Sequence, residues 1–337
     1  MKKVLVLFFI LSSLLNAGCF SQTKTYKDTR FSMDTTISIE AVGKNNEQIK
    51  TAVDNAFNVF QEIADETDRY KDSSPQGLYQ LNAHAGQGPF TVGHHLLLLA
   101  DMAHKQNFSE FDITLAPLID VWQKHSADKT LPDKQELDAA LTLTGKDKFN
   151  VAAGKQTITL APGAGLDLGA IAKGYAVDAA ASVLAGDKNV AFALVNAGGN
   201  IKTVGNKADG KPWRIALQDP RHSDAYLGII SLNADEAVAT SGDYQRYYEV
   251  NGVRYHHILD PHNGMPSRNA ISVTIVAASA FMTDYYSTLL FVLPQEKVLE
   301  VLADHPEIGA IIVKANQEIY ISPALQSRFE LTPAGGK

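Results

Sequence analysis

The sequence predicts an α+β protein: a single domain over residues 31–330 in which mixed and antiparallel sheets pack against helices. Patterns typical of helices and of strands follow one another without the regular βαβ spacing of a doubly wound sheet. Asn251-Gly252 separates two strand-like segments, which is the strongest short-range signal for an antiparallel hairpin. No linker-like segment divides the 337 residues, so we expect one domain rather than two.

The first half of the domain begins with Thr36–Val42, where apolar and polar residues alternate as in a half-buried strand. The apolar residues of Asn46–Thr67 fall near helical spacing, and Asn45 or Asn46 can cap this helix. Further along we expect a polar loop at 70–82, helices at 94–105, 114–124 and 132–143, and short strands at 149–151 and 157–160.

The second half begins with the Gly- and Ala-rich segment 163–178, which leads into a helix. A strand at 190–195 ends in the sequence Asn-Ala-Gly-Gly-Asn at 196–200. The later elements are strands at 213–218, 228–232, 247–250, 253–258 and 271–277, helices at 280–292 and 296–304, and a final hairpin of 310–314 with 318–321.

The N-terminus has the features of an export signal over residues 1–18. Lys2 and Lys3 precede an apolar run at 4–15, which is shorter than the ~20 residues that span a bilayer. Cys19 is the only cysteine, so no intrachain disulfide can form. Its position after Ala17-Gly18 resembles a bacterial lipoprotein signal, although Leu15 lies four residues before it rather than the usual three.

We therefore expect a chain that is exported and anchored through a lipid on Cys19, on the periplasmic side of a bacterial membrane. Residues 19–30 would form a polar tether to the domain. The alternative is an ordinary cleaved signal peptide followed by an incidental cysteine.

Composition and charge narrow the function classes. The chain is 45% apolar and 20% charged, which excludes a disordered, collagen-like or coiled-coil protein. It carries 30 Lys and Arg against 37 Asp and Glu, a formal net charge of −7, so we expect no nucleic-acid partner. An anionic small ligand remains compatible, because a site can be locally positive or contain a metal ion.

Two glycine-rich turns are candidates for ligand binding. Asp167–Gly174 opens a helix, where free backbone N–H groups and the helix dipole suit phosphate, and Lys173 adds a charge. The turn at 196–200 follows a strand and would let a ligand approach the backbone closely. Each has a structural alternative: tight helix packing for the first and a plain turn for the second.

Two further segments carry reactive side chains. Strand alternation puts His256 and His257 on opposite faces, so only one can face a given site and act as a general base. Asp284 and Thr288 are four residues apart on a predicted helix, and their oxygens suit Mg²⁺ beside a phosphate substrate. A structural histidine and a threonine bonded to its own helix are the alternatives.

These segments together resemble the ApbE family of FAD:protein FMN transferases, over residues 28 to 330. The motifs are DLGAIAKGYAVD, VNAGGN, TSGDYQRYY, HHILDP with a Gly three residues later, and TDYYST. The resemblance implies one ApbE-like domain, related to the T-fold, that binds FAD as substrate in a cleft. It implies Mg²⁺-dependent transfer of FMN to a Thr or Ser of a target protein, with release of AMP.

The resemblance also assigns residues. It implies that His257 is the catalytic base and that Mg²⁺ is bound by Asp284, Thr288 and a backbone oxygen of Ala170. Ser287 stands where many members have a further acidic ligand, and Asp34 and Asn263 also depart from the family pattern. The flavin and nucleotide contacts it implies are Met33, Tyr70, Phe111, Asp112, Asp167, Lys173 and Ile258.

The implied partners are flavin-accepting subunits of membrane redox-driven ion pumps, or other extracytoplasmic flavoproteins. Two alternatives stay open at this point. One is a Mg²⁺-dependent FAD pyrophosphatase, in which water replaces the protein hydroxyl. The other is a flavin-binding lipoprotein without turnover.

Overall fold

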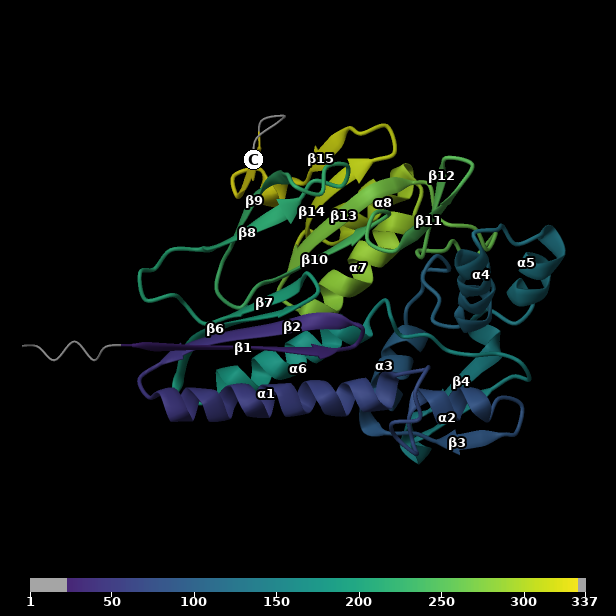
Figure 1. Cartoon of the computed structure of the whole chain (residues 1–337), viewed down its shortest axis with the longest axis horizontal. Helices are drawn as coiled ribbons and strands as arrows, with labels where there is room; N and C mark the ends of the chain where they lie inside the picture. The colour runs from purple at the N-terminus through teal and green to yellow at the C-terminus, as the bar shows by residue number, and fades with distance from the viewer. Residues whose placement is uncertain (1–22, 333–337) are drawn as a thin grey trace, which may run out of the picture.

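The computed structural model describes residues 23–332 and centres on one eight-stranded sheet in which every neighbouring pair is antiparallel (Figure 1). In spatial order the strands are β1 (Lys24–Ser32), β2 (Thr35–Gly43), β6 (Val190–Ala197), β7 (Asn200–Val204), β10 (Ala237–Gly242), β13 (Ala270–Ala277), β14 (Gly309–Lys314) and β15 (Ile319–Ile321). Strand β2 alternates inward apolar residues with outward polar ones, whereas the central strand β13 is buried on both faces.

Three helices cover one face of this sheet: α1 (Asn46–Thr67), α6 (Ala172–Gly186) and α7 (Ala280–Val292) (Figure 1). The side chain of Asn45 caps α1 by accepting hydrogen bonds from two backbone N–H groups of its first turn. Helix α7 is buried nearly all round because it lies between α6 and the sheet. It therefore brings any polar side chain it carries into the interior.

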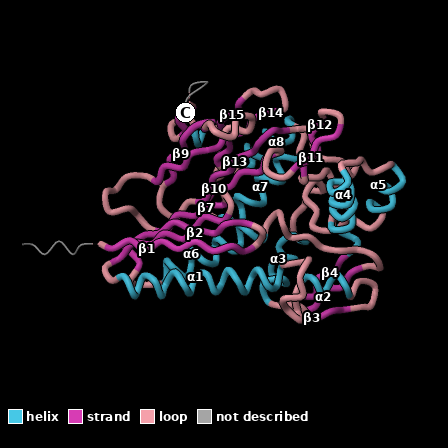
Figure 2. Tube along the Cα trace, in the orientation of Figure 1, coloured by secondary structure: helices cyan, strands magenta, loops and turns pink. Residues whose placement is uncertain are grey.

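A smaller sheet covers the opposite face, with β8 (Trp213–Gln218) and β9 (Tyr226–Leu232) joined by β16 (Phe329–Leu331). Its apolar side chains, including Ile230 and Phe329, pack with Val238 and Ile311 of the main sheet. Figure 2 separates the helices from the strands of these layers.

The remaining elements form a lobe beside the end of α1 (Figure 1). The rings of Trp122 and Tyr255 stack within it, at a centroid distance of 5.7 Å. Its elements are α2 (Leu78–Ala83), β3 (Pro89–Thr91), α3 (His94–His104), α4 (Ala116–Asp128), α5 (Lys134–Leu141), β4 (Phe149–Ala152), β5 (Thr157–Leu160), β11 (Tyr247–Val250) and β12 (Val253–His256). Helix α8 (Gln295–Asp304) follows α7, and short 3₁₀ turns occur at Lys146–Lys148, Ala153–Lys155 and Pro323–Leu325.

The predicted α+β class with antiparallel sheets is confirmed, and helices α1 and α7 have the predicted bounds. One correction concerns the tether predicted for residues 19–30, because Lys24–Ser32 forms the edge strand β1. The predicted loop at 70–82 also contains the start of α2. Residues 1–18 and Cys19 lie outside the described residues. Within 23–332, none of the helices is both long and apolar enough to cross a membrane.

Candidate functional site

A cavity of about 1190 Å³ opens where the main sheet, the lobe and the start of α6 meet. The turn between β1 and β2 forms part of its rim, with Met33 and Asp34 both in the left-handed backbone region (φ 51° and 56°). This two-residue turn carries both side chains to the cavity without a glycine. Strand β10 and the chain that follows it supply the opposite wall.

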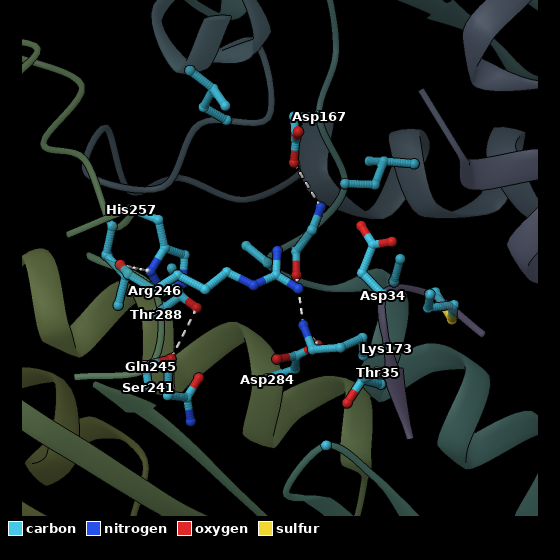
Figure 3. A pocket seen from close by; sticks show the side chains of 18 of the residues that line it. Asp34, Thr35, Asp167, Lys173, Ser241, Gln245, Arg246, His257, Asp284 and Thr288 are labelled. Atoms are coloured by element: carbon cyan, nitrogen blue, oxygen red, sulfur yellow. Dashed lines mark hydrogen bonds and ion pairs between the residues drawn. The ribbon is translucent and has the colours of Figure 1, made fainter. Parts of the chain in front are cut away.

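The predicted site residues other than Ser287 line this one cavity, although they come from six separate parts of the sequence. Figure 3 shows Asp167, Lys173, His257, Asp284 and Thr288 around the same space. All of the flavin contacts implied by the resemblance line it as well, namely Met33, Tyr70, Phe111, Asp112, Asp167, Lys173 and Ile258.

Asp284 lies on the buried side of α7 and is only 5% exposed. Its Oδ2 accepts a hydrogen bond of 2.9 Å from the backbone N–H of Gly174, and the ammonium nitrogen of Lys173 is 3.9 Å away. Burial raises the pKa of Asp284 above its usual range, and these two neighbours offset that rise only in part. When Asp284 is ionised, its buried negative charge is therefore only partly neutralised by the protein, and a bound cation would stabilise it.

Thr288 is one helical turn beyond Asp284 and also faces the cavity. The hydroxyl of Ser241, on β10, lies 3.2 Å from that of Thr288 and 2.9 Å from that of Ser287. Ser287 is fully buried, donates to the backbone oxygen of Asp284, and is not part of the cavity wall. Ser287 thus lies behind the cavity wall, whereas Asp284 and Thr288, the other side chains of the predicted metal set, line the cavity.

Residues 23–332 contain no group of three or more His, Cys, Asp or Glu side chains that could hold a metal ion. The donors available here are one carboxylate, one hydroxyl and the backbone of Ala170, which lines the cavity. Such oxygen donors fit Mg²⁺, which usually keeps several waters and binds through one or two carboxylates plus substrate phosphates. These donors, and the only partly neutralised carboxylate of Asp284, are compatible with Mg²⁺.

His256 and His257 do different things. His256 is 3% exposed, and its Nε2 donates to the carbonyl of Ser267 at 2.8 Å while its Nδ1 accepts from the N–H of Ile258 at 3.2 Å. Burial lowers the pKa of His256 to about 4. Both of its ring nitrogens are occupied in holding the chain.

His257 faces the cavity and is exposed to it. Its Nδ1 lies 3.2 Å from the carbonyl of Arg246, which can only accept, so Nδ1 carries the proton and Nε2 is left with a free lone pair. The surrounding cavity walls, together with the charges of Arg246 and Lys173, lower the pKa of His257. The neutral ring can therefore take up a proton at Nε2.

The turn before α6 is held by a pairing that the sequence pattern did not suggest. The buried guanidinium of Arg69 reaches Asp120 and Asp167, each at 2.7 Å, and lies over the ring of Tyr70. Asp167 in turn accepts from the N–H of Gly169 at 2.8 Å. In the sequence, Arg69 is notable only as the neighbour of Tyr70, a predicted flavin contact. That position does not identify acidic partners so distant in sequence.

Comparison with known proteins identifies the family. A family model described as the ApbE family matches residues 33–312. The chain belongs to the ApbE family. The resemblance predicted from the motifs is thus confirmed, and the matched range includes every predicted site residue that lines the cavity.

Among ApbE relatives, the FAD:protein FMN transferase of Klebsiella pneumoniae (strain 342) is 34% identical, over 83% of this chain and 88% of that one. The protein of the same name from Treponema pallidum is 28% identical, over 98% and 95% of the two chains. The crystal structure of the ApbE protein from Thermotoga maritima gives a TM-score of 0.80 at 31% identity and covers 89% of this chain and 98% of that one. The flavin transferase ApbE from Vibrio cholerae gives a TM-score of 0.77 at 27% identity, with 91% and 100% covered.

Proposed function

We propose that this ApbE-family chain is a FAD:protein FMN transferase that attaches FMN through a phosphoester bond to a Thr or Ser of a target protein. One observation carries the proposal most: a neutral histidine with a free Nε2 shares a cavity with Lys173 and with the Asp284–Thr288 pair. A proton acceptor beside cationic and oxygen donor groups is what transfer of a phosphoryl-linked group to a hydroxyl requires.

The reaction balances as a displacement at phosphorus. The hydroxyl oxygen of the target forms a bond to the phosphorus of the FMN half of FAD. The bond from that phosphorus to the bridging oxygen breaks, and AMP leaves with this oxygen. His257 receives the hydroxyl proton at Nε2, while the carbonyl of Arg246 holds the ring through Nδ1. Lys173 contributes positive charge beside the pyrophosphate, and the walls of the cavity orient the flavin.

The residues that would hold Mg²⁺ are Asp284, Thr288 and the backbone of Ala170, with Ser287 behind them. When bound there, Mg²⁺ supplies charge neutralisation for the pyrophosphate oxygens. The buried carboxylate of Asp284 and its neighbouring hydroxyl support this part of the proposal.

We further propose that the mature chain works outside the cytoplasm, on the periplasmic side of a bacterial membrane and anchored by a lipid on Cys19. The sequence of residues 1–19 supports this location. The expected protein partners are flavin-accepting subunits of membrane redox-driven ion pumps or other extracytoplasmic flavoproteins.

The test is incubation of the purified chain with FAD, Mg²⁺ and a candidate acceptor domain, followed by mass analysis of the acceptor for one added FMN. The wild-type chain should add FMN and release AMP. A pyrophosphatase would instead release FMN and AMP equally with and without the acceptor, and it would form no adduct. Bound FAD that stays intact would indicate a flavin-binding protein without turnover.

The same assay tests the base. His257→Ala should lower transfer by about 10²- to 10⁴-fold while FAD still binds, because the proton acceptor acts in the chemical step. His256→Gln is the matched control and should cost much less. Similar losses in both variants, or normal transfer by His257→Ala, would contradict the assignment.

A further inference from the structure

Arg246 has an unusual environment for an arginine in the cavity wall. Its side chain is exposed to the cavity, and within residues 23–332 its guanidinium makes no hydrogen bond or ion pair. In the view of Figure 3 it extends from the side of His257 across the cavity toward Lys173 and Asp284. By contrast, Arg69 in the same wall is held by two aspartates.

The backbone that carries Arg246 is firmly fixed. Three residues earlier, buried Asp243 accepts two hydrogen bonds of 2.8 Å from Arg221, and the guanidinium of Arg254 approaches it to 3.4 Å. At Arg246 itself, the backbone carbonyl accepts from the N–H of His257 at 3.2 Å. A guanidinium without a partner thus projects from a rigid support into a space that a ligand can fill.

The charge of the cavity gives this cation a role. Seven carboxylate side chains line the cavity against four from Lys and Arg, so the wall as a whole disfavours an anionic substrate. Of the four cations, Arg69 is neutralised by Asp120 and Asp167, and Lys173 is shared between the Gly169 carbonyl and Asp284. Within residues 23–332, Lys71 and Arg246 are the two cations of this group that make no ion pair, and Arg246 is the one that lies beside His257.

We propose that Arg246 binds the pyrophosphate of FAD and stabilises the charge that spreads over the phosphoryl oxygens as FMN is transferred. This inference rests on the proposed function and adds a residue to it. The planar guanidinium offers two parallel donors to phosphate oxygens, and such charged contacts strengthen where water is excluded. Phosphoryl transfer depends mainly on positioning and on charge stabilisation of this kind.

A purely structural role makes a different prediction. The backbone carbonyl of Arg246 orients His257, and a side-chain substitution leaves that carbonyl in place. If the side chain binds phosphate, its loss lowers affinity for ligands that carry the pyrophosphate and spares affinity for riboflavin. If it only supports the loop, affinity for riboflavin, which lacks phosphate, falls together with affinity for FAD.

The experiment uses the purified full chain and the variants Arg246→Gln, Arg246→Lys and Arg246→Gly. Dissociation constants for FAD and for riboflavin are measured from the change in flavin fluorescence, and transfer is measured at saturating FAD. Arg214→Gln is the matched control, because Arg214 is exposed on β8 and paired with Glu330 outside the cavity.

Arg246→Gln should weaken FAD binding about tenfold or more and change riboflavin binding less than about twofold. Transfer at saturating FAD should fall about 100-fold, and Arg246→Lys should recover part of the loss. Guanidinium chloride at millimolar concentration should restore transfer by the Arg246→Gly variant, whereas NaCl at equal ionic strength should not.

Unchanged FAD affinity and unchanged transfer in Arg246→Gln would overturn the proposal, as would equal losses of FAD and riboflavin binding. Failure of the proposed function looks different, because the wild-type chain would then give no FMN adduct. In that case the paired FAD and riboflavin affinities still decide whether Arg246 contacts the pyrophosphate.

Discussion

Replacing His256 by Gln should flatten the acid dependence of stability. The pKa of His256 is lowered by burial from 6.5 to about 4, so the folded state keeps this ring neutral where the unfolded chain would bind a proton. Its contribution is fully present above pH 6.5 and is lost as the pH falls toward 4. The whole interval corresponds to about 3 kcal/mol of unfolding free energy, of which about 2 kcal/mol is lost between pH 7 and pH 5.

Glutamine keeps a side-chain N–H that can donate to the Ser267 carbonyl but does not titrate in this range. Urea unfolding at pH 7 and pH 5 gives the free energy of unfolding of each variant. The wild type should lose about 2 kcal/mol more than His256→Gln over this interval. His94→Gln, a change at an exposed histidine on α3, should follow the wild type. Parallel pH dependence in the wild type and His256→Gln would refute the reasoning.

Three other predictions concern the metal site, helix packing and the anchor. Asp284→Ala should nearly abolish FMN transfer, and Thr288→Val should reduce it less and raise the Mg²⁺ requirement, because a carboxylate neutralises a cation and a hydroxyl does not. A Mg²⁺ titration of transfer after EDTA treatment checks this. Wild-type rates with wild-type Mg²⁺ dependence in Asp284→Ala would show that the metal binds elsewhere. Gly174→Ala should lower the free energy of unfolding by about 1–3 kcal/mol and also lower transfer, because the new Cβ would lie 2.7 Å from the Cβ of Asp284 and against the backbone oxygen of Ala280. Urea unfolding measures the loss. A variant as stable as the wild type would show that α6 and α7 can move apart at this contact without cost. Cys19→Ser should move the chain from the membrane fraction to the soluble fraction, and a wild type that is already soluble would contradict lipidation.

The elements predicted well from sequence are those with strong local signals. Helix α1 has regular apolar spacing and an asparagine cap, and the Asn251-Gly252 turn has the positive φ angles expected of its hairpin (52° and 75°). Strand β1 was missed because it is an edge strand whose outer face is charged and exposed, which leaves little apolar alternation to detect. Strand β10 was missed because small residues buried between two strands carry no period of two.

The candidate site followed a similar rule. Residues inside distinctive motifs, such as Lys173, His257 and Asp284, could be named from sequence, and they do share one cavity. The pairing of Arg69 with Asp167 could not be named, because it joins residues far apart in sequence and depends on the placement of the lobe against the sheet. The unpaired state of Arg246 was equally invisible, since it depends on which carboxylates the fold directs elsewhere.

Strand β1 sets the distance between the proposed membrane anchor and the chemistry. Its nine residues run from Lys24, near the N-terminal end in Figure 1, to Ser32 at the rim of the cavity. At about 3.3 Å per residue the strand spans about 30 Å, and its pairing with β2 along its whole length makes it stiff. A lipid on Cys19 would thus hold the cavity opening roughly 30 Å farther from the bilayer than the start of the strand when β1 stands upright. The height at which an acceptor presents its hydroxyl would then select among membrane-bound targets, and lengthening or shortening the chain before Lys24 would shift that height.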